Sequence, residues 1–391
     1  MTIAFFSNFI NHHQKLVADE IFKIIGDNYT FVELTPMPDT FRNNGYADYS
    51  GEPYVLQAWK NKESEEKARQ LSQNVDVAFF DGVLTLNYEI LRAKTHPQKL
   101  SFEVSERWLK RGWLNLLSPR LLKWFFYYHV LLKYSNCYKL CSSAFVPNDM
   151  RILSAFKGRC LKWGYFTKTQ GDGGYVGERT ENNEEISIMW CARFLKWKHP
   201  ELPVLLASKI KEEGYHFHID MYGDGLEKRK ISELIKKKKV EDVVHLKGVM
   251  PNEQILAAMR QHDIFLFTSD RNEGWGAVLN EAMSCGCAVV ASNEIGATPY
   301  LIKDGENGFD FKSKALNSLY EKVMTLLQDK DLRLRFGTQA KLDLQSIWSP
   351  QSAVKNLFQC IEDIECGEGS SLVNGPCSPA FPVTIYKQNR Q

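Results

Sequence analysis

The stretch EGWGAVLNEAMSCGCAVVASNEIG, from Glu273 to Gly296, decides the fold. It holds two glutamates eight positions apart around the glycine-rich turn GWG, then a helix-forming segment and the small apolar run AVVAS. The apolar run IFLFTS precedes it at 264–269. Strand, glycine turn, helix and strand in this order form the repeating unit of a parallel sheet covered by helices. The stretch therefore predicts an α/β domain of the Rossmann-like kind.

The same alternation extends over most of the C-terminal half. Continuous apolar runs of strand length alternate with amphipathic helical patterns from ISIMWCAR to NGFDF. Such strands are typical of a parallel sheet that is buried on both faces. The N-terminal half shows a weaker version, in which TIAFFS (2–7) predicts a strand and residues 11–26 predict a helix. We therefore expect two Rossmann-like α/β domains.

Composition suggests where the domains divide. The segment TQGDGGYVGERTENNEE is glycine-rich and polar, which favours a linker. The tail has Ser, Pro and Gly and little periodicity. The predicted divisions are an N-terminal domain over 1–166, a linker over 167–185, a C-terminal domain over 186–346, a helix over 347–366 that crosses back to the first domain, and a disordered tail over 367–391.

The overall composition excludes several classes of protein. Of 391 residues, 44% are hydrophobic and 25% charged, and the net charge is +2, which argues against a nucleic-acid-binding or disordered protein. The nine cysteines show no paired CxxC set, so we expect free thiols rather than a disulfide framework. The N-terminus lacks the features of a signal peptide, and the longest apolar run, WFFYYHVLL, is too short to span a bilayer. A cytoplasmic protein is expected.

The charge is unevenly distributed, however. Residues 101–170 hold twelve Lys and Arg against three acids, interleaved with aromatic residues. This pattern suits an anionic membrane surface, and it places the protein at the inner face of the membrane. A helical hairpin with its aromatic residues in the core and its lysines in solvent explains the pattern equally well.

The chemistry is expected where strands end, because ligands of open α/β sheets bind at the carboxyl ends of the strands. Gly274 and Gly276 let the backbone approach a ligand, and the helix that starts near Ala277 offers free N–H groups to a phosphate. Glu273 and Glu281 would then accept hydrogen bonds from the hydroxyls of a sugar or ribose. Taken alone, the two glutamates also fit a dipole-favoured helix start and a surface position.

Three further strand ends add to this pattern. Arg193 and Lys198 follow the first strand of the C-terminal half and offer a planar fork and a point charge to phosphate oxygens. The turn YGDG, with Gly223, ends the next strand, and HLKGVM, with Val249, ends another. A basic loop without a ligand is the alternative interpretation for Arg193 and Lys198.

Together these segments, with IGATPYLIKDGENGF, resemble the retaining glycosyltransferases of family 4 (glycosyl transferases group 1) over residues 187–311. The resemblance implies the GT-B fold, with two facing Rossmann-like domains and a deep cleft between them. It implies that Arg193 and Lys198 bind a diphosphate, that Glu273 holds the donor sugar, and that Glu281 binds ribose. It places Val249 beside the base, and it implies that the backbone of the turn and helix start binds sugar and phosphate: Gly274, Trp275, Gly276, Ala277, Val278 and Leu279.

The N-terminal half departs from that family. The first strand is followed by SNFINHHQ (7–14) instead of a glycine pair, and no active-site histidine stands clearly after a later strand. His13 and Glu106 are the candidates for the reacting centre, and Asp81 is a candidate for the cleft lining. A polar helix cap at His12 and His13 is the alternative.

No metal or cofactor is expected, because Arg193, Lys198 and the helix start can neutralise a diphosphate. The acidic segment DKD (329–331) is interpreted as solvated surface. We expect a retaining hexosyltransferase that moves a sugar from a UDP- or GDP-linked donor to a glycan or lipid-linked acceptor, in synthesis of a surface polysaccharide such as capsule, O-antigen or exopolysaccharide. The alternatives are an inactive nucleotide-sugar-binding partner protein and a GT-B nucleotide-sugar epimerase.

Overall fold

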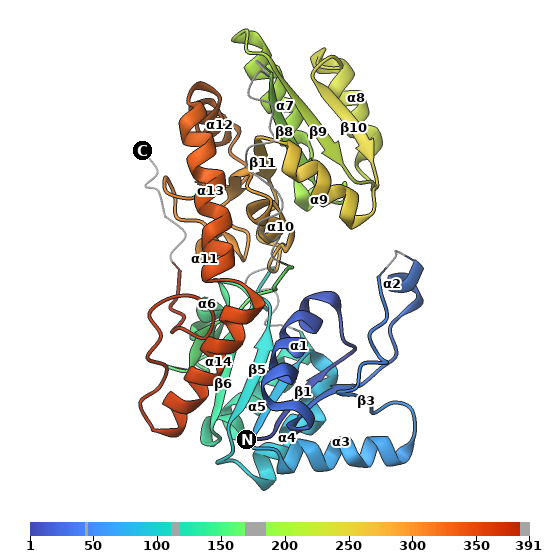
Figure 1. The fold of residues 1–391 in the computed structure, drawn as a ribbon, viewed down its shortest axis with the longest axis vertical. Helices are drawn as coiled ribbons and strands as arrows, with labels where there is room; N and C mark the ends of the chain where they lie inside the picture. The colour runs from blue at the N-terminus through green and yellow to red at the C-terminus, as the bar shows by residue number, and fades with distance from the viewer. Residues whose placement is uncertain (44–45, 111–117, 169–184, 384–391) are drawn as a thin grey trace. The chain divides into compact units, whose positions relative to one another are not determined.

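The structure, a computed structural model, describes residues 1–43, 46–110, 118–168 and 185–383. These residues form two compact units (Figure 1). One unit comprises Met1–Lys168 together with Ile347–Val383. The other comprises residues 185–346. Most of the predicted linker, 169–184, lies outside the described residues. The cleft expected between the units stays a prediction.

The first unit is built on a parallel sheet of order β3-β2-β1-β4-β5-β6-β7. Its strands are β1 (Ile3–Ser7), β2 (Tyr29–Glu33), β3 (Val55–Gln57), β4 (Val77–Asp81), β5 (Ser101–Ser105), β6 (Cys137–Cys141) and β7 (Cys160–Lys162). The helices are α1 (His12–Ile25), α2 (Asp39–Asn43), α3 (Lys62–Asn74), α4 (Leu86–Thr95), α5 (Pro119–Val130) and α6 (Val146–Ile152). The strand order reverses at β1, which has β2 on one side and β4 on the other.

Aromatic residues hold the centre of this sheet. Phe5 stacks on Phe31 and Phe79 with ring centroids 5.2 and 5.4 Å apart, and Phe79 stacks on Phe102 at 5.0 Å. These rings come from four neighbouring strands in register, since side chains at paired positions face the same side. All five residues of β1 are buried, as the apolar run TIAFFS predicts.

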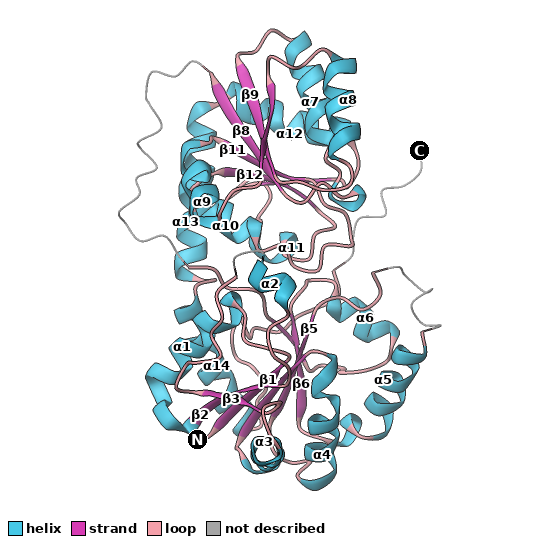
Figure 2. Ribbon diagram, turned by 90° about the vertical axis from the view of Figure 1, so that its right-hand side faces the viewer, coloured by secondary structure: helices cyan, strands magenta, loops and turns pink. Residues whose placement is uncertain are grey.

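The second unit is built on a parallel sheet of order β10-β9-β8-β11-β12-β13. Figure 2 shows helices on its two faces. Its strands are β8 (Ile186–Cys191), β9 (Phe217–Tyr222), β10 (Val244–Gly248), β11 (Ile264–Phe267), β12 (Ala288–Ser292) and β13 (Phe309–Phe311). The helices are α7 (Glu201–Glu212), α8 (Lys228–Lys238), α9 (Asn252–Gln261), α10 (Val278–Ser284), α11 (Thr298–Leu301), α12 (Leu316–Gln328) and α13 (Lys330–Ser346).

The predicted fold class is confirmed by these two sheets. Strands β11 and β12 are buried along their whole length, because helices cover both faces of a parallel sheet. The segment DKD is exposed at the start of α13, where the carboxylate of Asp329, just before the helix, accepts a 2.8 Å hydrogen bond from the Leu332 amide. It caps a helix, which agrees with its interpretation as solvated surface.

Helix α14 (Pro350–Glu365) belongs to the first unit and packs against α1. Ser349 caps it, and Pro350 occupies its first turn, where a missing N–H costs nothing. Val354, Leu357 and Ile361 form its buried face. The chain thus returns to the unit in which it began.

The tail corrects one expectation. Residues 367–391 were expected to be disordered, but the structure describes them up to 383, and residues 377–380 pair with the edge strand β7. The Lys162 amide donates to Ser378 at 2.8 Å, while the amides of Cys377 and Ala380 donate to the carbonyls of Lys162 and Cys160 at 2.7 and 2.8 Å. A single pairing along one strand leaves no periodic pattern, so composition alone misses it. Residues 384–391 lie outside the described part of the chain.

Candidate functional site

The centre of the candidate site is an ion pair between Lys198 and Glu273. Lys198 lies in the loop after β8, and Glu273 lies in the loop after β11, the neighbouring strand. Hydrogen bonds join the two loops: Thr268 Oγ1 donates to the Lys198 carbonyl at 2.7 Å, and the Asp270 amide donates to the Trp197 carbonyl at 2.9 Å. The parallel sheet therefore brings together two residues that are 75 positions apart.

This ion pair is largely withdrawn from water. The side chains of Lys198 and Glu273 are only 11% and 12% exposed. Burial lowers the pKa of Lys198, and the Glu273 carboxylate opposes that change. The ammonium also lies 4.3 Å from the centroid of the Trp197 ring, a favourable cation–π position. A cation held by one carboxylate at a strand end can exchange that partner for a phosphate oxygen.

Arg193 lies in the same loop, two residues after β8, and is exposed. Its charge acts to lower the pKa of Lys198, so the two cations lie within electrostatic reach of each other. The sequence prediction that these two residues act together is consistent with this geometry. Two cations held near each other attract an anion.

The glycine turn after Glu273 is tightly constrained. Gly276 has φ +96°, and a Cβ there would lie 2.5 Å from the Phe267 ring. The Trp275 indole is fully buried and donates to Asn280 Oδ1 at 2.9 Å. Trp275 and Leu279 bury their side chains, so only their backbone atoms can reach a ligand. Gly274, Ala277 and Val278 complete this turn up to the start of α10.

Glu281 occupies a different environment on α10. Its carboxylate is bonded by the side chain of Asn252 at the start of α9, and its charge influences Cys191 at the end of β8. Burial raises the pKa of Glu281 to about 7. A carboxyl group in this state can accept a hydrogen bond from a hydroxyl when ionised and can donate a hydrogen bond when neutral.

Gly223 and Val249 mark the ends of the two outer strands. Gly223 has φ +125°, and its missing Cβ would lie 2.0 Å from the Ala192 carbonyl oxygen. Its amide donates to the Gly248 carbonyl at 2.7 Å, which joins the loops after β9 and β10. Val249 is 75% exposed beside this contact. All predicted donor-binding residues thus follow the carboxyl ends of β8, β9, β10 and β11.

In the first unit, the two predicted residues are joined through a tyrosine. The His13 ring stacks on Tyr165 with centroids 5.3 Å apart, and Tyr165 OH donates to Glu106 Oε1 at 2.7 Å. Burial and the neighbouring His12 lower the pKa of His13 to about 3, so the ring is neutral. His13 Nδ1 lies 3.3 Å from the Phe166 carbonyl, which can only accept a hydrogen bond. Nε2 is then the acceptor nitrogen.

A second polar group lies beside His13. Gln14 Nε2 donates to Asp81 Oδ2 at 2.6 Å and to Ser7 Oγ at 3.0 Å. Burial raises the pKa of Asp81 to about 6. A cavity of about 50 Å³ is lined by Asn11, His13, Gln14, Asp81 and Tyr165, among others. This volume suits a few waters or one small polar group.

The N-terminal cap of α1 is not formed by His12 or His13, as the alternative interpretation held. The cap of α1 is Asn11, whose side chain accepts hydrogen bonds from the amides of His13 and Gln14. The Asn11 amide in turn donates to Gln14 Oε1, which completes a capping box. The spacing N-x-x-Q in NHHQ carried this signal. The imidazole rings of His12 and His13 are therefore not needed as caps.

Comparison with known proteins now bears on this site. The family model described as Glycosyl transferases group 1 matches residues 177–343. The matched segment contains every predicted donor-binding residue.

The second unit is a glycosyl transferases group 1 domain.

Two curated relatives and one solved structure illustrate the similarity. An uncharacterised glycosyltransferase of Methanocaldococcus jannaschii is 26% identical over 196 residues, which are 49% of this chain and 48% of the relative. The poly(ribitol-phosphate) alpha-N-acetylglucosaminyltransferase of Staphylococcus aureus is 28% identical over 172 residues, which are 43% and 34%. The chain thus spans less than half the length of these curated relatives.

HepE of Anabaena has the same fold, with a TM-score of 0.66 at 14% identity over 93% of this chain and 100% of HepE. The predicted GT-B class is confirmed by such neighbours, and the similarity includes both units.

The structure of the group 1 domain adds residues that the sequence analysis missed. Asp270 is buried between His199 Nε2 at 3.4 Å and Lys314 Nζ at 3.0 Å, and its carbonyl accepts the Glu273 amide at 2.9 Å. It orients the loop that carries Glu273. Lys314 adds a third cation near that loop. An acid directly after the strand IFLFTS was the available signal, whereas nothing in the sequence marked Lys314.

The basic and aromatic segment 101–170 has some aromatic side chains in the core and others in solvent, and its contact with a membrane stays a prediction. Trp124, Tyr127 and Tyr128 of α5 are buried in the core of the first unit. Phe125 and Phe126, on the outer side of α5, are exposed beside Lys123, and Phe126 is 67% exposed. Residues 111–117 lie outside the described chain. No helix among the described residues is long and apolar enough to span a bilayer.

Proposed function

We propose that this protein is a retaining glycosyltransferase that moves a sugar from a nucleoside diphosphate donor to a glycan or lipid-linked acceptor. The observation that carries the proposal is the nearly buried Lys198–Glu273 pair at the carboxyl edge of a group 1 domain. One member of this pair suits the diphosphate, and the other suits the hydroxyls of the sugar.

The chemistry requires charge to build up on the leaving diphosphate as the bond between the anomeric carbon and oxygen breaks. Lys198, Arg193 and the backbone amides after Gly276 stabilise this charge in a site that excludes most water. When Lys198 turns to the phosphate, the Glu273 carboxylate is released to accept sugar hydroxyls and to orient the donor. Glu281 accepts hydrogen bonds from the ribose hydroxyls, and Val249 contacts the base.

The first unit supplies the acceptor side. His13 is neutral and keeps one nitrogen as an acceptor, so it suits a hydrogen bond from an acceptor hydroxyl. Glu106, through Tyr165, fixes the plane of that ring. Asp81 is a second polar group in the same cavity.

The acceptor class is inferred from α5 and from the relatives. Exposed aromatic residues beside lysines suit an anionic membrane surface. By its name, the Staphylococcus aureus relative acts on poly(ribitol-phosphate), a polymer. We propose a surface polysaccharide or its lipid-linked precursor as the acceptor, and a location in the cytoplasm at the inner face of the membrane.

The first experiment is a thermal stability screen with UDP, GDP and ADP and their sugars. A ligand that binds only the folded protein stabilises it in proportion to ln(1 + [L]/Kd), so one nucleotide should raise Tm clearly above the others. HepE was solved with UDP and glucose, which favours UDP. The shift should be lost in Glu281→Ala and kept in Glu233→Ala, which alters an exposed glutamate of α8. Equal behaviour of all nucleotides would contradict the proposal.

The second experiment separates an enzyme from an inactive binding partner and from an epimerase. Incubation with the selected donor alone should release the nucleotide slowly, and the released sugar should keep its configuration. Glu273→Gln should abolish this release. Binding without any release favours the partner protein, whereas conversion of the sugar while it is still attached to the nucleotide favours the epimerase.

Metal dependence gives a third test. We propose that transfer needs no metal, since Arg193, Lys198 and the backbone amides after Gly276 can neutralise the diphosphate. After treatment with a chelator, added Mg²⁺ or Mn²⁺ should leave the rate of transfer unchanged. Restoration of a lost rate by Mg²⁺ would refute this part of the proposal.

Membrane contact is tested by flotation with vesicles that contain an anionic lipid. Phe125→Ser with Phe126→Ser should reduce the bound fraction several-fold. Phe381→Ser, an exposed phenylalanine of the tail, serves as the matched control and should bind like the wild type. Equal binding by all three proteins would exclude α5 as the contact surface.

A further inference from the structure

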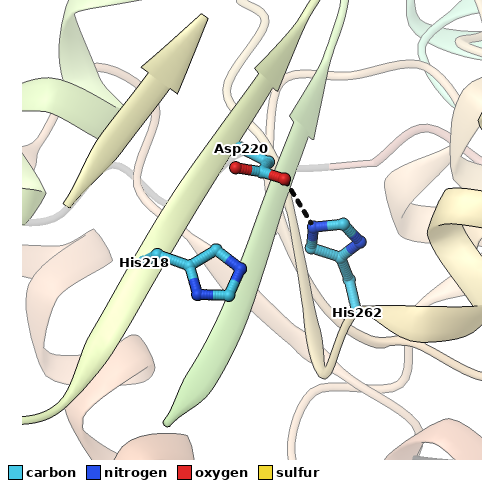
Figure 3. Close-up of side chains that lie close together, drawn as sticks. All are labelled: His218, Asp220 and His262. Carbon is cyan, nitrogen blue, oxygen red and sulfur yellow. Dashed lines mark ion pairs between the residues drawn. The ribbon is translucent and has the colours of Figure 1, made fainter. Parts of the chain in front are cut away.

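Two histidines and an aspartate gather on one side of β9. The Lys198–Glu273 pair, by contrast, lies in the loops that follow β8 and β11. Figure 3 shows His218 and Asp220 on β9 and His262 beyond α9, with the three side chains turned toward one another. One ligand atom from each lies within 4.8 Å of the others. Among the described residues, this is the group whose donor atoms converge in the manner of a metal site.

His262 shows an arrangement that needs explanation. Its side chain is buried, and its Nδ1 lies 2.7 Å from the Ala258 carbonyl oxygen. Because a carbonyl oxygen only accepts, Nδ1 carries a proton. Nε2 then faces the Asp220 carboxylate at 3.5 Å, a distance too long for a good hydrogen bond, and it has no hydrogen-bond partner among the described residues.

Metal-binding histidines commonly donate their second ring N–H to a carbonyl or a carboxylate, which orients the free nitrogen toward the ion. His262 does so with Ala258. His218 has a similar partner, because its Nδ1 lies 3.1 Å from Glu185 Oε2. Both rings are thus oriented from behind, as a metal ligand would be.

Asp220 supplies the negative charge. Its side chain is buried, and two cationic or polar side chains approach its oxygens. His245 Nδ1 lies 3.1 Å from Oδ1, and Lys247 Nζ lies 3.2 Å from Oδ2. Lys247 is the competitor for the position of a cation, and its side chain is free enough in solvent to move away.

We propose that His218, Asp220 and His262 bind a divalent first-row metal ion, with Zn²⁺ as the best fit. Imidazole nitrogens with one carboxylate are a ligand set that zinc accepts in tetrahedral geometry. His245 or a water completes the four ligands. Small rotations of the side chains bring the ligand atoms to bonding distance.

The position of this site indicates its effect. It joins β9 to the turn between α9 and β11, at an outer part of the sheet. It lies within β9, before the Gly223 turn, and shares no residue with the predicted donor site. Bound metal should therefore stabilise the second unit without entering the transfer reaction.

The test uses the full-length protein, stripped by a chelator and titrated with Zn²⁺ alone by calorimetry. The wild type should bind one ion per chain at this site. His218→Ala should weaken binding at least about 10-fold, and Glu185→Ala, which removes the acceptor behind the His218 ring, about 10-fold through loss of ring orientation. His216→Ala is the matched control, because this exposed histidine lies two positions before His218 and should change nothing.

Lys247→Ala provides a test of opposite sign. Removal of the ammonium that neutralises Asp220 should tighten Zn²⁺ binding several-fold. His218→Ala is preferred to a change at His262, because His218 is partly exposed and its loss leaves no buried gap. Circular dichroism of each variant confirms that the fold is kept.

Substitution by Co²⁺ identifies the ligands. Histidine and carboxylate ligands should give visible d–d bands of a four-coordinate ion without the near-ultraviolet charge-transfer band of a thiolate. A thiolate band would assign the ion to one of the nine cysteines and would overturn the proposal. Equal Zn²⁺ affinity of the wild type and His218→Ala would overturn it as well.

Discussion

At the scale of single residues, the Lys198–Glu273 pair links stability to function. Lys198→Ala leaves the Glu273 carboxylate largely buried without its cation. Breaking a fully buried pair costs roughly 3–5 kcal/mol, and this pair keeps about a tenth of its surface in water, so we expect a loss of about 1–3 kcal/mol. Transfer should fall at least about 100-fold, as for loss of an oxyanion-stabilising group. Urea unfolding and initial rates measure the two effects.

A matched control separates these effects. The exposed pair of Arg229 and Glu233 on α8 has the same charges, and Arg229→Ala should change stability by less than about 0.5 kcal/mol and leave transfer intact. The double variant Lys198→Met with Glu273→Gln should regain stability but not activity. Full activity in the double variant would contradict the proposed roles.

Glu281 predicts a pH dependence. Its folded-state pKa of about 7 lies above its value in the unfolded chain, because burial disfavours the charge. The contribution of neutral Glu281 to the free energy of unfolding is therefore fully present below about pH 4.5. It declines as the pH rises from there through 7, by up to about 3 kcal/mol in total. Glu281→Gln should remove this decline, so that the variant is more stable than the wild type at pH 8. Chemical denaturation at pH 5, 6, 7 and 8 tests this.

Donor binding should follow the opposite trend with pH. The ionised form of Glu281 is the better hydroxyl acceptor, so affinity for the donor sugar should rise between pH 6 and 8. A nucleotide sugar is the suitable ligand, because its diphosphate does not titrate in this range. A flat profile in the wild type would show that Glu281 does not contact the ligand.

At the scale of elements, the strand-end turns impose the strictest requirements on the backbone. Gly223 combines a positive φ with a missing Cβ that would overlap the Ala192 carbonyl. Gly223→Ala should destabilise the protein by at least about 2 kcal/mol and weaken donor binding, since the loop with Arg193 must shift. Gly214→Ala, with φ +78° and open space around it, should cost only about 1 kcal/mol. Urea unfolding and donor titration compare the two variants.

At the scale of the whole molecule, the tail stabilises the unit in which the chain begins. Removal of residues 367–391 withdraws Cys377 and Ala380 from the first unit and exposes the edge of β7. We expect calorimetry to show a lower Tm for the first unit, by roughly 2–4 °C per kcal/mol lost. The transition of the second unit is recognised as the one that a donor nucleotide shifts, and it should stay unchanged.

Removal of residues 384–391 alone is the control for this truncation, and it should leave both transitions in place. A destabilisation equal to that of the longer truncation would show that the pairing with β7 is not the cause. Selective loss of the second transition would contradict the assignment of the tail to the first unit.

The two halves of the chain differed in how much could be predicted. In the second unit, glycine turns and acids follow clear apolar strands, and a parallel sheet places all such turns at one edge. The positions of Arg193, Glu273 and Glu281 at the strand ends were therefore predictable, and their roles stay predictions. In the first unit, Tyr165 joins His13 to Glu106 from a segment without periodic pattern, so the contact was not predictable. The spacing of Asn11 and Gln14 is a local signal for the capping box, which the sequence analysis missed.

The sequence by itself determined the two parallel sheets and the strand ends at which a ligand is proposed to bind, because local periodicity and glycine positions report the strands and turns directly. The tertiary structure alone decided which side chains meet. The burial of the Lys198–Glu273 pair, the raised pKa of Glu281, the pairing of the tail with β7 and the convergence of His218, Asp220 and His262 all depend on segments that are distant in the chain. Their proximity, and the exclusion of water around them, exist only after the sheets have formed.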